Sequence, residues 1–177
     1  IHANDWHTAM VPVYLDTQFR WREGYEYIKT VFSIHNIEFQ GKYGMEILGS
    51  VFGLGDDCAK LVEMDGCLNM MKGAIECSNA VTTVSRTYAN EILDPYFSFG
   101  LDPILAARRW KLSGIVNGID MDVFNPETDP AIAAHYSVDA PEDKVLNKRA
   151  LQQELGLPVD DNIPMVGMVG RLTDQKG

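Results

Sequence analysis

Apolar positions along this chain follow two periods, one typical of strands and one typical of helices. Short β-branched runs predict buried strands at 29–35 and 80–85, and residues 1–4 resemble the end of another strand. Apolar residues three and four apart, with capping residues and prolines beside them, predict helices. The helices that we expect lie at 7–19, 67–77, 86–93, 103–110 and 142–155, and a last strand lies at 165–169.

One stretch has no clean period. Residues 38–57 are rich in glycine and aromatic side chains, so we expect an ordered loop there, with a short helix near 45–52. Residues 20–27 are polar and aromatic, and we expect a second loop.

Strands and helices that take turns, with short connections, imply an α/β fold whose parallel sheet is covered by helices on both faces. In such a sheet, ligands bind beyond the carboxyl ends of the strands. This rule selects the residues just after each predicted strand as candidates for a site, at 4–7, 35–36, 85–86 and 170–176.

Gly, Asn and Pro residues interrupt the alternation at 112–129. We expect 114–120 to be a crossing between two domains, with residues 1–113 in the first domain and residues 121–177 at the start of the second. The first residue is Ile rather than Met, and the sequence stops where a helix should follow the last predicted strand. We therefore expect a fragment of a longer protein, and we expect the isolated fragment to be inactive.

Composition and charge narrow the class of protein. The 177 residues are 46% hydrophobic, which is typical of a globular protein, and the net charge of -10 argues against a nucleic-acid partner. The three cysteines form no CxxC pair and are odd in number, which argues against a disulfide framework or a zinc site. No apolar run approaches the roughly 20 residues of a membrane span. We expect a cytoplasmic protein with no membrane partner.

The stretch HANDWHT places a carboxylate, an indole ring and an imidazole directly after a predicted strand. Asp5 can accept hydrogen bonds from sugar hydroxyls while Trp6 packs on the sugar ring. An equally simple interpretation is that Asp5 caps the following helix. His2, Asp5 and His7 also suggest a metal site, but a strand-to-helix turn points them in different directions and no Cys or Glu joins them. We therefore predict no metal.

The stretch FSIHNIEFQGKYG carries a second set of polar residues. His35 ends a predicted buried strand, and the glycine-containing loop after it can bend around a ligand. A lone histidine at a strand end is more often structural than catalytic. The hypothesis of a site rests on its neighbours Asn36, Gln40 and Tyr43, which supply the donors, acceptors and rings that a polyhydroxyl ligand needs.

The last residues, VGRLTDQKG, predict an anion site. Arg171 and Lys176 flank a predicted helix start, where backbone N–H groups and the helix dipole favour negative charge. A planar guanidinium and a compact ammonium together suit a diphosphate. The spacing is not that of a phosphate-binding P-loop, and no GxGxxG occurs in the chain. Taken alone, the segment is better interpreted as a surface loop with ordinary charges.

Five motifs, in their order and separations, resemble those of the bacterial glycogen synthases and plant starch synthases: HANDWHT, VFSIHNIEFQGKYG, AVTTVSRTYANEI, SGIVNGIDMDVFNPETD and VGRLTDQKG. The resemblance runs from end to end and matches an internal segment of those enzymes. It implies a retaining glycosyltransferase of the GT-B type, with two Rossmann-like domains facing across a cleft. Such enzymes move glucose from ADP-glucose to the non-reducing end of an α-1,4-glucan, with neither a metal nor a cofactor. In a plant the location would be the plastid.

The resemblance also assigns roles to residues. Arg171 and Lys176 would hold the donor diphosphate and stabilise its departure. His35 would lie beside the transferred glucose, with its side chain near the sugar 6-hydroxyl and its carbonyl near the anomeric centre, and Asp5 would contact the sugars. The resemblance further places sugar or acceptor near Trp6, His7, Asn36, Asn117 and Gly170. For Asn117, a simple Asn-Gly turn is an alternative.

The chain lacks two motifs of those enzymes, a Lys-x-Gly-Gly loop and a Glu-containing, Gly-rich motif, so the choice of ADP as the nucleotide rests on the resemblance alone. One competing hypothesis is a glucan- or nucleotide-binding module without catalysis. Another is a different GT-B enzyme, such as a sucrose-type synthase, which shares the fold but not the pairing of HANDWHT with GRLTDQKG.

Overall fold

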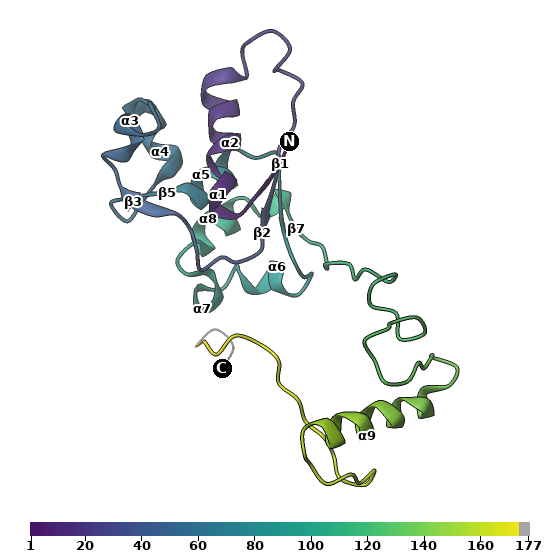
Figure 1. Cartoon of the computed structure of the whole chain (residues 1–177). Coiled ribbons are helices and arrows are strands. Elements are labelled where there is room, and N and C mark those ends of the chain that lie inside the picture. The colour runs from purple at the N-terminus through teal and green to yellow at the C-terminus, as the bar shows by residue number, and fades with distance from the viewer. Residues whose placement is uncertain (174–177) are drawn as a thin grey trace. The chain divides into compact units, whose positions relative to one another are not determined.

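The computed structural model describes residues 1–173 and divides the chain into two compact units. The first unit is Ile1–Asn117, and the second begins at Gly118 (Figure 1). This boundary falls inside the segment 114–120 that we expect to be an interdomain crossing. The assignment of the two units to the two domains of a glycosyltransferase stays a prediction.

Four short strands form a parallel sheet in the first unit, in the order β1 (His2–Asn4), β2 (Val31–Ile34), β6 (Ala80–Thr83) and β7 (Leu112–Gly114). The strands predicted at 1–4, 29–35 and 80–85 are confirmed, each over fewer residues, and so is an α/β fold with a parallel sheet. The sequence does not predict β7, because serine and glycine are weak strand formers.

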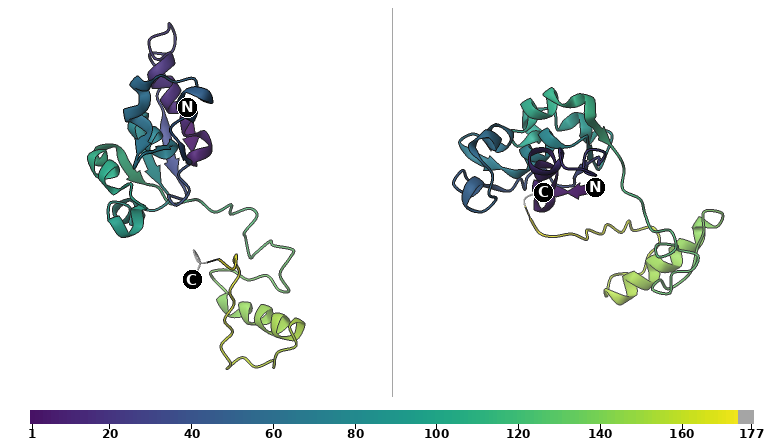
Figure 2. Two further views of the ribbon diagram at one scale, coloured as in Figure 1. Left: turned by 90° about the vertical axis from the view of Figure 1, so that its left-hand side faces the viewer. Right: turned by 90° about the horizontal axis from the view of Figure 1, so that it is seen from above.

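Helices connect these strands. The elements are α1 (Asp5–Thr8), α2 (Met10–Tyr14), a π-helical turn (Leu15–Phe19), α5 (Met70–Cys77), α6 (Tyr88–Glu91), α7 (Pro95–Ser98), α8 (Asp102–Ala107) and a 3₁₀ turn (Arg109–Lys111). They confirm the helices expected at 7–19, 67–77, 86–93 and 103–110, with shifted ends, and add α7. Residues 20–27 form a loop of turns that projects from the unit (Figures 1 and 2).

The hydrophobic core lies on one face of the sheet. Ala3 pairs with Phe32, and Phe32 pairs with Val81, so their side chains share that face. They are buried in one cluster with Met71 and Ile75 of α5. This cluster accounts for the apolar face that the sequence predicts for α5.

The opposite face of the sheet is polar and partly open in the described part of the chain, and the coverage of both faces by helices stays a prediction. In the described part of the chain, His2 and Asn4 of β1 and Ser113 of β7 are exposed there. The physical reason is the strand order: parallel strands taken in sequence order are joined by right-handed crossovers, which place the connecting helices on the same face.

A second, antiparallel sheet was not expected from the sequence. It has the order β3 (Lys42–Gly44), β5 (Cys67–Asn69) and β4 (Glu63–Met64). Beside it lie α3 (Ile47–Ser50), which confirms the short helix expected near 45–52, a 3₁₀ turn (Asp56–Cys58) and α4 (Ala59–Val62). The helix expected from residue 67 starts only at Met70, because Cys67–Asn69 pairs in this sheet and the Asn69 side chain caps the helix by accepting from the Lys72 N–H at 3.0 Å.

The second unit contains a 3₁₀ turn (Pro141–Asp143) and α9 (Lys144–Glu154), which confirm the helix expected at 142–155. Gly156, with a φ of 65°, follows the end of α9 as predicted. The strand expected at 165–169 is wrong for the described residues. This segment runs without regular structure and Val166 and Val169 are exposed, because a strand needs a hydrogen-bonded neighbour and none of the described residues of this unit provides one.

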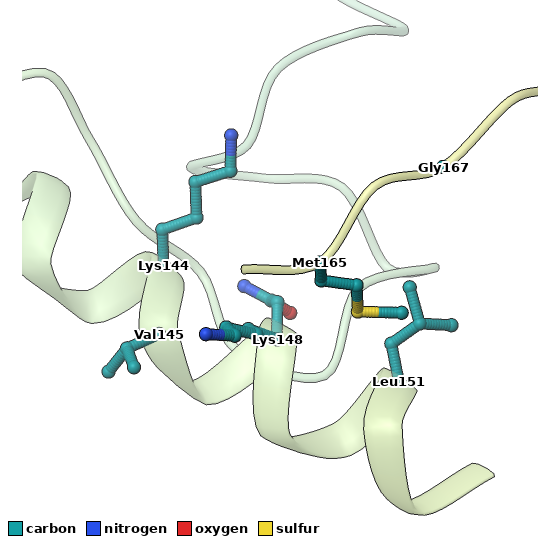
Figure 3. Close-up of a pocket in the computed structure, with 7 residues that line it drawn as sticks. Lys144, Val145, Lys148, Leu151, Met165 and Gly167 are labelled. Atoms are coloured by element: carbon teal, nitrogen blue, oxygen red, sulfur yellow. The ribbon is translucent and has the colours of Figure 1, made fainter. Parts of the chain in front are cut away.

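Met165 and Leu151 point toward one another across a hollow of about 560 Å³ beside α9 (Figure 3). None of the predicted site residues within 1–173 lines this hollow, so we assign no function to it. Among the described helices of both units, none is long and apolar enough to cross a membrane.

Candidate functional site

Asp5 stands at the junction of β1 and α1 and reaches across to the end of β2. Its Oδ1 accepts hydrogen bonds from the backbone N–H of His35 at 2.8 Å and of Asn36 at 3.2 Å. Asp5 makes no capping bond to its own helix, since the N-cap position is Asn4 and no side-chain cap is formed there. The carboxylate therefore joins the carboxyl ends of two neighbouring strands, and the capping alternative does not describe it.

The backbone of Asp5 is unusual. Its φ of 50° lies in the left-handed region, which a non-glycine residue adopts at a cost of about 1 kcal/mol or more. The fold holds this conformation where the strand turns directly into the helix, and it brings the carboxylate to the edge of the sheet. A strained residue at the edge where ligands bind is consistent with a functional role.

His35 is exposed just after β2, and its ring is held from the neighbouring strand. Its Nε2 lies 3.0 Å from Oδ1 of Asn4, the last residue of β1. The rule on strand ends includes Asn4 among the candidates at 4–7, but nothing in the spacing of the motif shows that its side chain meets His35. The main chain and the ring of His35 are thus fixed by two consecutive residues, Asn4 and Asp5.

The loop after His35 is anchored by Gln40. The side chain of Gln40 is 2% exposed, donates to the carbonyl groups of Ile37 at 3.1 Å and Phe99 at 3.2 Å, and accepts from Asn69 Nδ2 at 2.7 Å. We expected Gln40 to offer polar groups to a ligand. That expectation is wrong, because these bonds occupy both ends of its amide inside the protein.

A pocket of about 340 Å³ gathers four of the predicted residues. Asp5, Trp6, His7 and Asn36 line it, together with Phe39, which is 55% exposed and was not predicted. The rings of Trp6 and His7 lie 4.2 Å apart, tilted by 31°. Aromatic faces beside a carboxylate and an amide suit a ligand that carries both hydroxyls and apolar C–H surface.

The main chain at Gly41 packs against the indole ring of Trp6. Its φ is 65°, and a Cβ atom built on it would lie 2.9 Å from Cε3 of Trp6. Only glycine combines that backbone conformation with such a close approach. This glycine of the predicted ordered loop therefore lets the main chain pack closely against the indole ring.

His35 also borders a second pocket, of about 210 Å³, on the open face of the sheet. Asn117 lines it too, so the structure brings these two predicted residues to one place. His2 Nε2 bonds Ser33 Oγ at 2.7 Å, which bonds Thr82 Oγ1 at 2.6 Å, and this polar row forms the pocket wall. Asn117 sits in a stretch without turns, so the Asn-Gly turn is not what the structure shows.

The predicted anion site lies in the second unit. Gly170 and Arg171 are exposed near the end of the described residues, and Lys176 lies outside them. Within residues 1–173, no group of three His, Cys, Asp or Glu side chains could hold a metal ion. The thiols of Cys58, Cys67 and Cys77 are free, and burial raises the pKa of Cys77 to about 12.

Comparisons with known proteins identify the family of the chain. The sequence model of the starch synthase catalytic domain matches residues 1–107. A glycogen synthase of Streptococcus agalactiae is 52% identical over the whole chain, which covers 38% of that enzyme. A glycogen synthase of Clostridium perfringens is 50% identical over the whole chain, which covers 37% of it.

A solved structure gives the same result for the fold. The catalytic domain of starch synthase IV from Arabidopsis thaliana, bound to ADP and acarbose, superposes with a TM-score of 0.77 at 36% identity, over 92% of this chain and 34% of that one. The predicted α/β fold of the GT-B type is thereby confirmed. The chain spans less than two fifths of the curated relatives named here, at 38% and 37% of their length. Since the family match covers more than half of the chain, the chain belongs to the starch synthase catalytic domain family.

Proposed function

We propose that the complete protein transfers glucose from ADP-glucose to the non-reducing end of an α-1,4-glucan, with retention of configuration at the anomeric carbon. Family membership supports this proposal, as do the relatives named glycogen synthase and the related structure bound to ADP and acarbose. The partners are the nucleotide sugar and the glucan, and the reaction takes place in the cytoplasm, or in the plastid of a plant.

The single observation that carries the proposal is the bridge from Asp5 to His35 and Asn36. The Asp5 carboxylate accepts from two backbone N–H groups at the end of β2, and the residues of two separate motifs then surround one pocket. We assign the sugar to this edge. His35 lies beside the transferred glucose, Asp5, Trp6, His7 and Asn36 contact sugar or acceptor, and Asn117 completes the sugar contacts.

The donor half of the proposal rests on Arg171 and Lys176, with Gly170 beside them. A glucosyl transition state resembles an oxocarbenium ion, so catalysis comes from stabilising the departing diphosphate and from placing the acceptor hydroxyl. Two cations supply that stabilisation without a metal ion, a cofactor or an attacking carboxylate.

The test uses the full-length protein, radiolabelled ADP-glucose and glycogen. We expect the label to enter α-1,4 linkages. Arg171→Ala and Lys176→Ala should each slow turnover by about 10²-fold, which is the scale of losing one donor to a developing anion. Wild-type turnover in both variants would contradict the assigned roles.

A binding module without catalysis gives a different result. Calorimetry with ADP and with a maltooligosaccharide would then show binding, while no label enters glucan at any enzyme concentration. These two results together would contradict the transferase hypothesis and support a binding module without catalysis.

A further inference from the structure

The imidazole of His35 has one nitrogen engaged by the protein and one available. Nε2 lies 3.0 Å from Asn4 Oδ1, whereas Nδ1 has no hydrogen-bond partner among residues 1–173. A neutral imidazole has one N–H donor and one acceptor nitrogen, and the group bonded to the first decides what the second can do.

Asn4 is itself held firmly. Thr8 Oγ1 accepts from the Asn4 N–H at 2.6 Å and donates to the Asn4 carbonyl at 2.8 Å, so both main-chain groups of Asn4 are bonded to one side chain. The register pairs Asn4 with Ser33, and His35 lies two residues after Ser33, just beyond the end of β2 and on the same side as Ser33. The side chain of Asn4 thus meets His35 because of the strand pairing.

We propose that Asn4 is a positioning residue that fixes both the orientation and the tautomer of His35. The Nε2–H group donates to Asn4 Oδ1, which leaves the lone pair of Nδ1 as an acceptor for a sugar hydroxyl. The inference rests on the proposed function, since that function puts sugar beside His35. It adds that His35 meets the sugar as a hydrogen-bond acceptor at Nδ1, with its other nitrogen bound to β1.

Asp5 and Asn4 act on different parts of His35. Asp5 holds the main chain through the His35 N–H at 2.8 Å, and Asn4 holds the ring at 3.0 Å. Loss of Asn4 therefore leaves the residue in place and releases only the ring. A small change in ring position is costly, because transfer depends on the alignment of reacting groups.

The experiment compares Asn4→Leu, Asn4→Asp and Thr8→Val in the full-length enzyme. Asn4→Leu keeps the side-chain shape and removes the acceptor. Asn4→Asp keeps an acceptor that, as the ionised carboxylate, cannot donate. Thr8→Val removes the bonds to the Asn4 main chain and leaves the Asn4 side chain unchanged. We expect kcat to fall about tenfold or more in Asn4→Leu, with the KM for ADP-glucose changed by less than about twofold. Asn4→Asp and Thr8→Val should stay within about threefold of the wild type, because both keep an acceptor at position 4 and its strand pairing with Ser33.

A second measurement does not depend on activity. Long-range ¹⁵N–¹H correlation spectra of histidine-labelled full-length protein, assigned with His35→Gln, report which ring nitrogen carries the proton. We expect the Nε2–H form in the wild type and a mixture of tautomers in Asn4→Leu, or in Asn4→Ala if Asn4→Leu does not fold. The same ring spectrum in wild type and variant, or an Nδ1–H form in the wild type, would overturn the proposal.

These readouts separate the two hypotheses. If the wild type transfers no glucose, the proposed function fails while the spectra still decide whether Asn4 fixes the ring. If transfer occurs but Asn4→Leu keeps its kcat, the proposed function stands and the positioning role of Asn4 fails.

Discussion

Asp5 and His35 are joined by a 2.8 Å hydrogen bond from the His35 N–H to the Asp5 carboxylate, across 30 residues of sequence. The bond links the carboxyl ends of β1 and β2, and the same oxygen also accepts from Asn36. Ligands bind at the carboxyl ends of the strands in such a sheet. The Asp5 carboxylate therefore holds the backbone at this edge and also lies at the place where a ligand would bind.

Asp5 has a strained, left-handed backbone conformation and a carboxylate that accepts two hydrogen bonds. Two substitutions separate the effects of these features on stability. We expect Asp5→Ala to lower the free energy of unfolding by about 1–3 kcal/mol, because the N–H groups of His35 and Asn36 lose a charged acceptor and the strain remains. Asp5→Gly loses the same acceptor but relieves the φ of 50°, so it should be more stable than Asp5→Ala by about 1 kcal/mol. Urea unfolding of both variants measures the difference, and equal stabilities would show that the backbone is not strained.

The contact between Gly41 and Trp6 predicts a defect in glucan binding. Gly41→Ala should lower the free energy of unfolding by about 1–3 kcal/mol, because a Cβ would lie 2.9 Å from the indole, and the KM for glucan should rise as Trp6 moves. Gly53→Ala is a matched control, with a φ of 63° and nothing within 4 Å of the added Cβ. It should lose stability from backbone strain alone and keep its KM. A similar KM for glucan in the two variants would contradict a role of Gly41 in positioning Trp6.

Much of the site can be predicted from the sequence, because the pattern of strands and helices fixes which residues lie at the ends of the strands. The runs that form β2 and β6 are β-branched and buried, and residues just after them must lie at one edge of a parallel sheet. This rule predicts His35 and Asn36 after β2, and Asp5 after β1. Pairing between distant strands of two or three residues leaves no local pattern, so β3 with β5 was not found, and with it the burial of Gln40 against Asn69. The contact of Asn4 with His35 likewise depends on register.

Lys111 predicts a pH effect on stability. Lys111 is 9% exposed, and its Nζ donates to the carbonyl groups of Glu76 at 3.0 Å and Ser78 at 2.6 Å, at the C-terminal end of α5. Burial, followed by repulsion from Arg108, lowers the pKa of Lys111 below its usual value.

The sign of the effect follows from proton counting. Between the lowered folded pKa and the ordinary unfolded value of about 10.4, the unfolded chain binds more protons, so the free energy of unfolding rises with pH there. We expect the wild type to gain stability relative to Lys111→Met as the pH rises toward that value. Chemical denaturation of both proteins across this alkaline range gives the difference, and a flat difference would contradict the lowered pKa.

The position of Phe39 predicts that its removal weakens binding of the glucan acceptor and leaves binding of the ADP-glucose donor unchanged. It lines the pocket of Asp5, Trp6, His7 and Asn36 while 55% of its surface is exposed, which suits a ring that packs on sugar. Phe39→Ala should raise the KM for glucan by about fivefold to tenfold, equivalent to about 1–1.4 kcal/mol, with the KM for ADP-glucose unchanged. Tyr27→Ala removes another ring, 82% exposed in the projecting loop, and should change neither constant. If the KM for glucan stays at the wild-type value in Phe39→Ala, the acceptor does not pack on this ring, and the sugar contacts are limited to the polar residues of the pocket and Trp6.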